Sequence, residues 1–184
     1  AIGALNLLAS THQQMLGDPE FRALRGAAKV MSGRYAEATA DLSSPAIAND
    51  PSAALWRGYV ASQTGQWKEA RKAFGQGYGA LNQMAPKWRA RFARAGAEAG
   101  LALGDLGVAR TQLLMAQAAK AGVEEDLATS LVQAKLFEAE GDREKALAIY
   151  DALAQGREGP LQSAAILRAT QARLAQGQIT PVKA

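Results

Sequence analysis

The stretch GQWKEARKAF, residues 65–74, decides the fold because its spacing recurs along the chain. A helix-breaking glycine, Gly65, is followed five residues later by Ala70 and four residues after that by a bulky apolar residue, Phe74. The same spacing recurs at Gly33, Ala38 and Leu42, at Gly104, Ala109 and Leu113, and at Gly141, Ala146 and Tyr150. Successive glycines are 32, 39 and 37 residues apart, which is typical of repeats built from one helical hairpin. The sequence therefore predicts an array of stacked hairpins.

The composition favours helices throughout. The chain has 184 residues, 48% of them hydrophobic, and its alanines far outnumber its β-branched residues. A chain of this length holds either one compact domain or about five stacked hairpins. No apolar run approaches the roughly 20 residues that a membrane-spanning helix needs. We therefore expect a soluble, all-α protein.

The absence of cysteine and the net charge say little about the cellular compartment or the partner. The chain has no cysteine, which excludes disulfides and thiolate metal sites and suits both the cytoplasm and a bacterial periplasm. Both compartments stay open. The net charge of +4 and the pI near 9.5 favour acidic partners. The abundance of alanine and arginine indicates a bacterial protein.

Prolines and capping residues predict where the hairpin units begin. Asp18 before Pro19, and Asp50 before Pro51, each put a capping carboxylate ahead of a proline at the first helical position. The expected hairpin units are residues 18–48, 49–85, 86–122 and 123–157. The expected helices include 19–31, 34–42, 51–64, 67–80 and 86–103 within these units, and 160–176 after them. In the fourth unit, Glu124, Glu125 and Asp126 supply an acidic first turn that suits the helix dipole.

Both ends of the sequence cut through hairpin units. Ala4 and Leu8 precede Ala38 and Leu42 by 34 residues, so residues 1–17 are expected to be the trailing helix of a preceding repeat. Residues 158–184 are expected to hold the leading helix of a further, incomplete repeat, with a turn at Gly177. Because complete arrays carry polar capping repeats, we expect the chain to be a fragment of a longer protein.

The spacing resembles that of the tetratricopeptide repeat (TPR) family. The small residue at the eighth position of that family's unit corresponds to Gly26, Gly58, Ala97 and Ala134, and the residue two after the turn glycine to Tyr35, Trp67, Leu106 and Arg143. The match covers nearly the whole chain. It departs from the family in the leading helices, where Arg22 and Arg25, or Ala54 and Arg57, occupy positions that usually hold Trp and Leu. A related helical-hairpin repeat is the alternative.

The resemblance implies a right-handed superhelical α-solenoid of about ten helices, which serves as a protein–protein interaction scaffold. Its concave groove, lined by the leading helices, would bind a peptide or protein segment. The expected groove residues are Tyr59, Gln63, Arg91, Arg94, Glu98, Lys135 and Gln171, with Leu55, Ser62, Leu131, Glu138 and Leu167 as further candidates. These positions lack the paired Lys and Asn of the family's carboxylate clamp, so chaperone-tail binding is disfavoured.

A basic segment, PKWRARFAR at residues 86–94, offers a second type of surface. Lys87, Arg91 and Arg94 share one helical face, and Trp88 and Phe92 form the neighbouring apolar stripe. This cationic ridge is expected to be a solvated face, with an acidic protein as one alternative partner and nucleic acid as a less favoured one. Stacking of array ends, which would make the chain an oligomerisation module, is a further alternative.

Nothing in the sequence indicates catalysis or a cofactor. His12 is the single histidine, so neither a Ser-His-Asp triad elsewhere nor a histidine-based metal site can be assembled. Gly75, Gly77 and Ala80 spell GxGxxA, but a predicted helix precedes them where a dinucleotide loop requires a strand. These glycines instead predict a frayed or tightly packed helix end. We therefore expect a non-enzyme without cofactor or metal.

Overall fold

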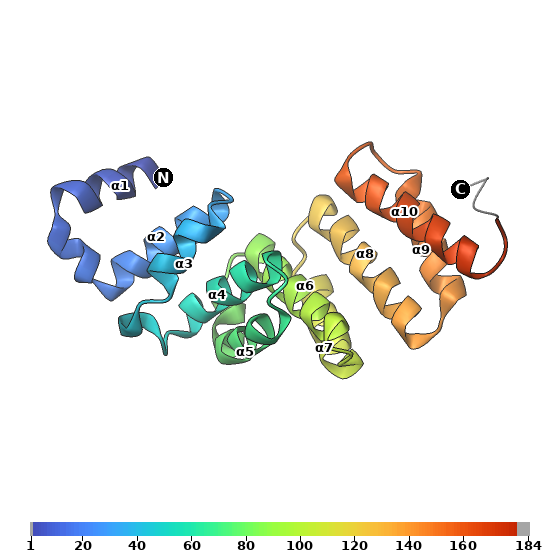
Figure 1. Ribbon diagram of the computed structural model, residues 1–184, viewed down its shortest axis with the longest axis horizontal. Coiled ribbons are helices and arrows are strands. Elements are labelled where there is room, and N and C mark those ends of the chain that lie inside the picture. The colour runs from blue at the N-terminus through green and yellow to red at the C-terminus, as the bar shows by residue number, and fades with distance from the viewer. Residues whose placement is uncertain (1, 180–184) are drawn as a thin grey trace.

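The computed structural model describes residues 2–179, which form ten α-helices, three short 3-10 helices and no strand (Figure 1). The α-helices are α1 (Ile2–Thr11), α2 (Pro19–Met31), α3 (Tyr35–Leu42), α4 (Pro51–Gln63), α5 (Trp67–Gly77), α6 (Pro86–Ala102), α7 (Leu106–Ala118), α8 (Val123–Glu140), α9 (Arg143–Ala154) and α10 (Pro160–Ala175). The 3-10 helices are η1 (Gln13–Gly17), η2 (Pro45–Ile47) and η3 (Tyr78–Gln83). Residue 1 of the first predicted unit and residues 180–184 of the last lie outside this description.

The helices pair in sequence order and the pairs form a row. Helix α2 packs on α3, α4 on α5, α6 on α7 and α8 on α9, while α10 packs on α9. Each even-numbered helix from α2 to α8 also contacts the next even-numbered helix. In Figure 1 the pairs follow one another along the longest axis, with α1 and α10 at opposite ends. The predicted all-α fold of successively packed helices is confirmed.

The recurring glycine closes each leading helix in the same way. Gly33, Gly65, Gly104, Gly141 and Gly177 have φ angles of 73°, 72°, 72°, 87° and 67°, in the left-handed region that glycine adopts without strain. At every turn the amide of the next residue donates to the carbonyl five residues earlier, over 2.8 to 3.0 Å, as Gln66 does to Ala61. This is a Schellman closure, which satisfies carbonyls that the helix end leaves unpaired.

The small and bulky residues of the repeated pattern lie against each other inside each hairpin. A Cβ atom added to Gly58 would lie 2.9 Å from the Phe74 ring, and one added to Gly26 would lie 2.6 Å from Leu42. In the later hairpins Ala97 clusters with Leu113, and Ala134 with Tyr150. The small side chain thus lets the two helices of a hairpin approach until the bulky side chain fills the space between them.

The helix predicted at residues 67–80 is shorter in the structure. Helix α5 ends at Gly77, and the chain continues as η3. A Cβ atom on Gly77 would lie 2.7 Å from Leu55 and 2.9 Å from the carbonyl oxygen of Pro51, so this helix end is tightly packed against α4. Gly75, by contrast, has open space around it.

The buried core runs along the row as three clusters of unequal size. The largest joins α2 to α7 around Leu42, Leu55, Phe74 and Phe92. A second cluster links α6 and α7 to α8, and a third joins α8, α9 and α10 around Tyr150. Within residues 2–179 no helix has the combined length and apolarity that crossing a bilayer requires.

Candidate binding surface

Aromatic side chains join α4 to α6, the leading helices of two successive hairpins. Trp56 and Tyr59 project from α4, and Trp88 and Phe92 from α6; helical spacings of three and four put each pair on one face. The Trp56 and Trp88 ring centroids are 4.6 Å apart, and those of Tyr59 and Trp88 are 5.7 Å apart. Both pairs have the edge-to-face geometry that aromatic quadrupoles favour. This cluster fixes α6 against α4.

A buried carboxylate, Glu125, joins α8 to α6. Its side chain is 3% exposed, and it accepts hydrogen bonds from Arg91 Nε at 2.6 Å and from Arg94 Nη1 at 2.8 Å. The Arg91 guanidinium also lies over the Trp88 ring, 5.1 Å from its centroid, where a cation–π attraction holds it. We call Arg91, Arg94 and Glu125 the Glu125 clamp.

The two arginines control the ionisation of the clamp. Burial alone would raise the pKa of Glu125, but the hydrogen bonds from Arg94 and Arg91 outweigh it, so the pKa lies below its ordinary value. Burial is also the main cause that raises the pKa of the neighbouring Tyr59, against the charges of the same arginines. Glu125 is therefore an ionised part of the packing between α6 and α8.

The expectation of a solvated cationic ridge is wrong for Arg91 and Arg94. Their side chains are turned into the interface with α8, and only Lys87 keeps an exposed end, where its Nζ lies 3.5 Å from Glu124. The acidic first turn expected for α8 is present, and two of its members, Glu124 and Glu125, also neutralise the ridge. The physical reason is stacking, which brings the start of α8 beside α6.

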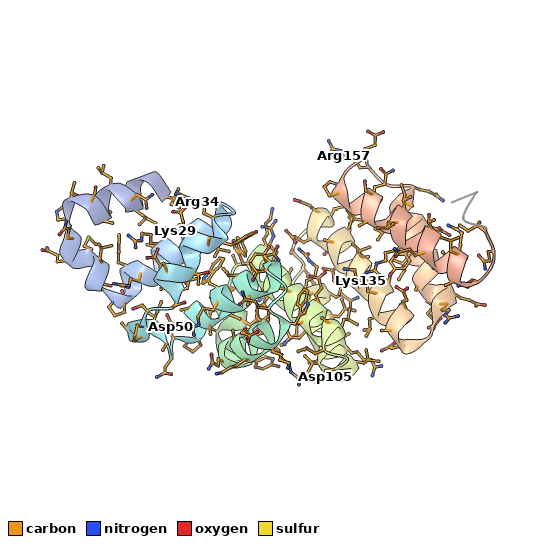
Figure 2. All side chains as sticks on the ribbon, viewed as in Figure 1. Lys29, Arg34, Asp50, Asp105, Lys135 and Arg157 are labelled. Atoms are coloured by element: carbon orange, nitrogen blue, oxygen red, sulfur yellow. The ribbon has the colours of Figure 1, made fainter. Side chains whose placement is uncertain are left out.

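A hollow of about 450 Å³, lined by both charged and apolar side chains, lies further along the leading helices. Its lining comes from α6, α8 and α10, with Trp67 of α5 at one side. Lys135 of α8, labelled in Figure 2, donates to Glu98 of α6 at 3.1 Å. Glu138 of α8 accepts from the buried Tyr150 hydroxyl at 2.9 Å and lies 3.9 Å from Arg168 of α10. We call this hollow the leading-helix hollow.

The structure brings some of the predicted groove residues together and leaves others apart. Arg91 and Arg94 meet at Glu125, with which each forms an ion pair, and Glu98 pairs with Lys135. Tyr59 lies in the aromatic cluster beside the two arginines. Gln63 and Gln171 are exposed and belong to neither group. Their part in binding stays a prediction.

Two of the further candidates do not line a groove. Leu55 and Ser62 are buried, because Leu55 fills the space beside Gly77 and Ser62 turns its hydroxyl onto the carbonyl of Tyr59, 2.7 Å away. Leu131 packs onto the third core cluster, whereas Leu167 is 58% exposed on α10.

The sequence prediction missed side chains that pair with residues of a neighbouring leading helix. Glu125, Arg168 and Trp67 were not among the predicted groove residues, although Glu125 follows Arg91 by 34 residues, close to one repeat period. A search for opposite charges one period apart on leading helices finds this pair, and also Glu98 with Lys135.

The described residues offer little catalytic or metal-binding chemistry. His12 is exposed, and its Nδ1 lies 2.9 Å from the Thr11 hydroxyl. Among residues 2–179 no three His, Cys, Asp or Glu side chains are grouped so that they could hold a metal ion. Whether the chain is an enzyme stays a matter of prediction.

Comparison of the chain with protein-family models, with curated proteins and with solved structures finds no match. The assignment to the TPR family therefore stays a prediction from the repeat spacing.

Proposed function

We propose that the chain is a TPR-like, right-handed superhelical array that acts as a non-catalytic scaffold and binds a peptide or protein segment along its leading helices. The even-numbered helices from α2 to α10 are these leading helices. In arrays of stacked hairpins the small rotation between units makes one side an extended concave binding surface. The proposed partner is a polar, extended segment that carries charges of both signs.

The observation that carries this proposal is the leading-helix hollow. Three successive leading helices contribute to it, and its ion pairs are only partly covered, with side-chain exposures of 28% for Lys135 and 32% for Glu98. Exposed pairs of this kind hold each other weakly, so a partner's charged groups can replace either member at small cost. Trp67 and Leu101 add apolar surface beside them.

Site-specific photo-crosslinking of the full-length protein in its own cells tests the proposal. A photoreactive residue replaces Gln63 or Gln171, both exposed on leading helices, and in matched controls Thr111 of α7 or Ala148 of α9, both exposed on trailing helices. The proposal expects one partner to be captured from Gln63 and Gln171 and not from the controls. Equal capture from all four positions, or capture from the controls alone, contradicts it.

A second candidate function is the stacking of molecules end to end. Exposed apolar side chains at the two ends of the row favour it. Ile166 and Leu167 on α10 and Leu7 on α1 are exposed at opposite ends of the row. Contact between such ends in different molecules would join arrays head to tail. Sedimentation at rising concentration tests this candidate: a mass that stays monomeric in the micromolar range contradicts it.

A further inference from the structure

Three positions form an ion cluster in the first hairpin, and the second hairpin differs at two of them. In the first hairpin, Arg25 Nε donates to Asp41 at 2.8 Å, Arg25 Nη2 donates to its other oxygen, and Lys29 Nζ lies 2.8 Å from the same carboxylate. Asp41 is buried, and Lys29 lies on α2 where Figure 2 labels it. Here a carboxylate from α3 neutralises two cations from α2.

The second hairpin keeps one cation of this cluster and loses the carboxylate. Counted from the turn glycines Gly33 and Gly65, whose φ angles are 73° and 72°, Arg25 corresponds to Arg57. By the same count Lys29 corresponds to Ala61, and Asp41 to Ala73. Within residues 2–179, Arg57 has no carboxylate within ion-pair distance.

All three corresponding residues of the second hairpin line one hollow. This hollow, which we call the Arg57 hollow, has a volume of about 520 Å³ and lies between α3 and α5, with α4 as its floor. Arg57, Ala61 and Ala73 line it, together with Val60 and Leu42. The two alanines are much smaller than Lys29 and Asp41, so the space that those side chains fill in the first hairpin is open in the second. The volume is within the usual range of small-molecule sites.

The Arg57 guanidinium is held in place by hydrogen bonds that occupy only some of its N–H groups. Its Nη1 donates to the carbonyls of Ile47 at 3.0 Å and Leu42 at 3.3 Å, and its Nη2 donates to that of Ala48 at 2.9 Å. Three of the five N–H groups of a guanidinium are thereby occupied. The Nε–H and one Nη2–H remain, and these are the two nitrogens through which Arg25 binds the Asp41 carboxylate.

The electrostatics of the two arginines differ accordingly. The hydrogen bond to Asp41 raises the pKa of Arg25, whereas burial lowers the pKa of Arg57, with only the more distant charge of Asp50 opposing it. The other charged groups in the lining, Glu69 and Lys72, are exposed and of opposite sign. A cation that is partly desolvated without an anion is unfavourable, and a bound carboxylate relieves that cost.

We propose that the Arg57 hollow binds a small organic carboxylate, whose oxygens take the free Nε–H and Nη2–H of Arg57 and whose apolar body covers Val60, Ala61 and Ala73. The ligand's carboxylate would neutralise Arg57 in the second hairpin, as Asp41 neutralises Arg25 in the first. The site lies between the trailing helices α3 and α5, over α4, and shares no lining residue with the leading-helix hollow.

Titration of the protein with benzoate, followed by the arginine Nε–H signals in ¹H–¹⁵N NMR spectra, tests the proposal. Benzoate is expected to shift the Arg57 Nε–H signal saturably, with a Kd on the order of 1 mM for so small a ligand. The neutral isostere benzamide should shift it far less, and the Arg25 signal should not move because Asp41 already occupies that guanidinium. No saturable shift at Arg57, or equal shifts with benzamide, overturns the proposal.

Two variants make the test specific. Ala73→Asp supplies an internal carboxylate at the position of Asp41, so it should itself shift the Arg57 signal and abolish the response to benzoate. Arg57→Gln should also lose the response, but it removes hydrogen bonds to the α3–α4 connection and can unfold that region. Ala73→Asp leaves those bonds intact and therefore decides the matter: an undiminished benzoate response in this variant contradicts the proposed site.

Discussion

Two glycines on adjoining helices of one hairpin have opposite surroundings. Gly58 of α4 faces the Phe74 ring at a distance that leaves no room for a methyl group, while Gly75 of α5 has no atom near the position of a Cβ. Neither has a positive φ angle. At Gly58 the missing Cβ is needed for packing, and at Gly75 it only adds flexibility to a helix.

Alanine substitutions at these two positions should therefore change stability in opposite directions. Gly58→Ala forces Phe74 to move and should lower the free energy of unfolding by about 1–3 kcal/mol. Gly75→Ala should raise it by up to about 1 kcal/mol, because alanine favours the helix more than glycine does. Urea titration followed by circular dichroism measures both; a destabilised Gly75→Ala variant would contradict the picture of an open site.

At the level of elements, the Glu125 clamp couples α8 to α6 in a manner that depends on pH. Because the folded-state pKa of Glu125 lies below its unfolded value of about 4.3, the clamp contributes its full stability above that pH. The contribution is lost as the pH falls through the folded-state pKa. Asp41, whose pKa is likewise lowered by Arg25 and Lys29 against its burial, adds to the same acid sensitivity.

Glu125→Gln should accordingly destabilise the protein near neutral pH and matter less in acid. Removing the charge leaves two partly buried arginines without their carboxylate, and we expect a loss of about 2–4 kcal/mol at pH 7. As the pH falls below the ordinary pKa of a glutamate and through the lowered folded-state pKa of Glu125, the stability of the variant should approach that of the wild type. Denaturant titrations at several pH values measure this difference.

The matched control is Glu124→Gln, one residue earlier on the same helix. Glu124 has an 81% exposed side chain and only the pairing with Lys87, so its loss should change stability by less than about 0.5 kcal/mol at any pH. A Glu125→Gln variant whose deficit does not shrink in acid would show that its effect does not come from ionisation.

Sequence predicted those elements that local geometry determines. The turn glycines and the proline-led starts of α2, α4, α6 and α10 depend on neighbours within a few residues, and they lie where the spacing indicated. The pairing of Arg91 and Arg94 with Glu125 depends on the stacking of whole hairpins, which residue spacing within one helix does not encode. Similarly, the Arg57 hollow results from alanines that look like ordinary helix residues until the first hairpin is compared with the second.

On the scale of the whole molecule, the clusters of buried apolar residues become smaller toward the C-terminal end. The largest cluster spans α2 to α7, while α8, α9 and α10 share the smaller third cluster and join the rest through the second cluster and the ion pairs of α6 with α8. In a row of units that touch only their neighbours, stability varies along the row.

We therefore predict that α8 to α10 unfold at lower denaturant concentration than α4 to α7. Trp56, Trp67 and Trp88 are the three tryptophans, and all lie in α4, α5 or α6, so tryptophan emission reports on the central hairpins alone. Its transition should come at a higher urea concentration than that of helical circular dichroism, which senses every helix. Hydrogen exchange should be slowest in α4 and α6. Superimposable transitions with uniform exchange would indicate one cooperative unit.

The five identical glycine turns have a consequence for how such a protein can change in length over evolution. Each turn is closed by two backbone bonds onto the end of its own leading helix, so copying the coding segment for one hairpin creates no new loop that must be shaped by selection. An added hairpin then needs only helix faces that pack against the adjoining hairpins. Point changes in a copy, such as those that distinguish Lys29 and Asp41 from Ala61 and Ala73, can afterwards turn a structural position into a place for a ligand.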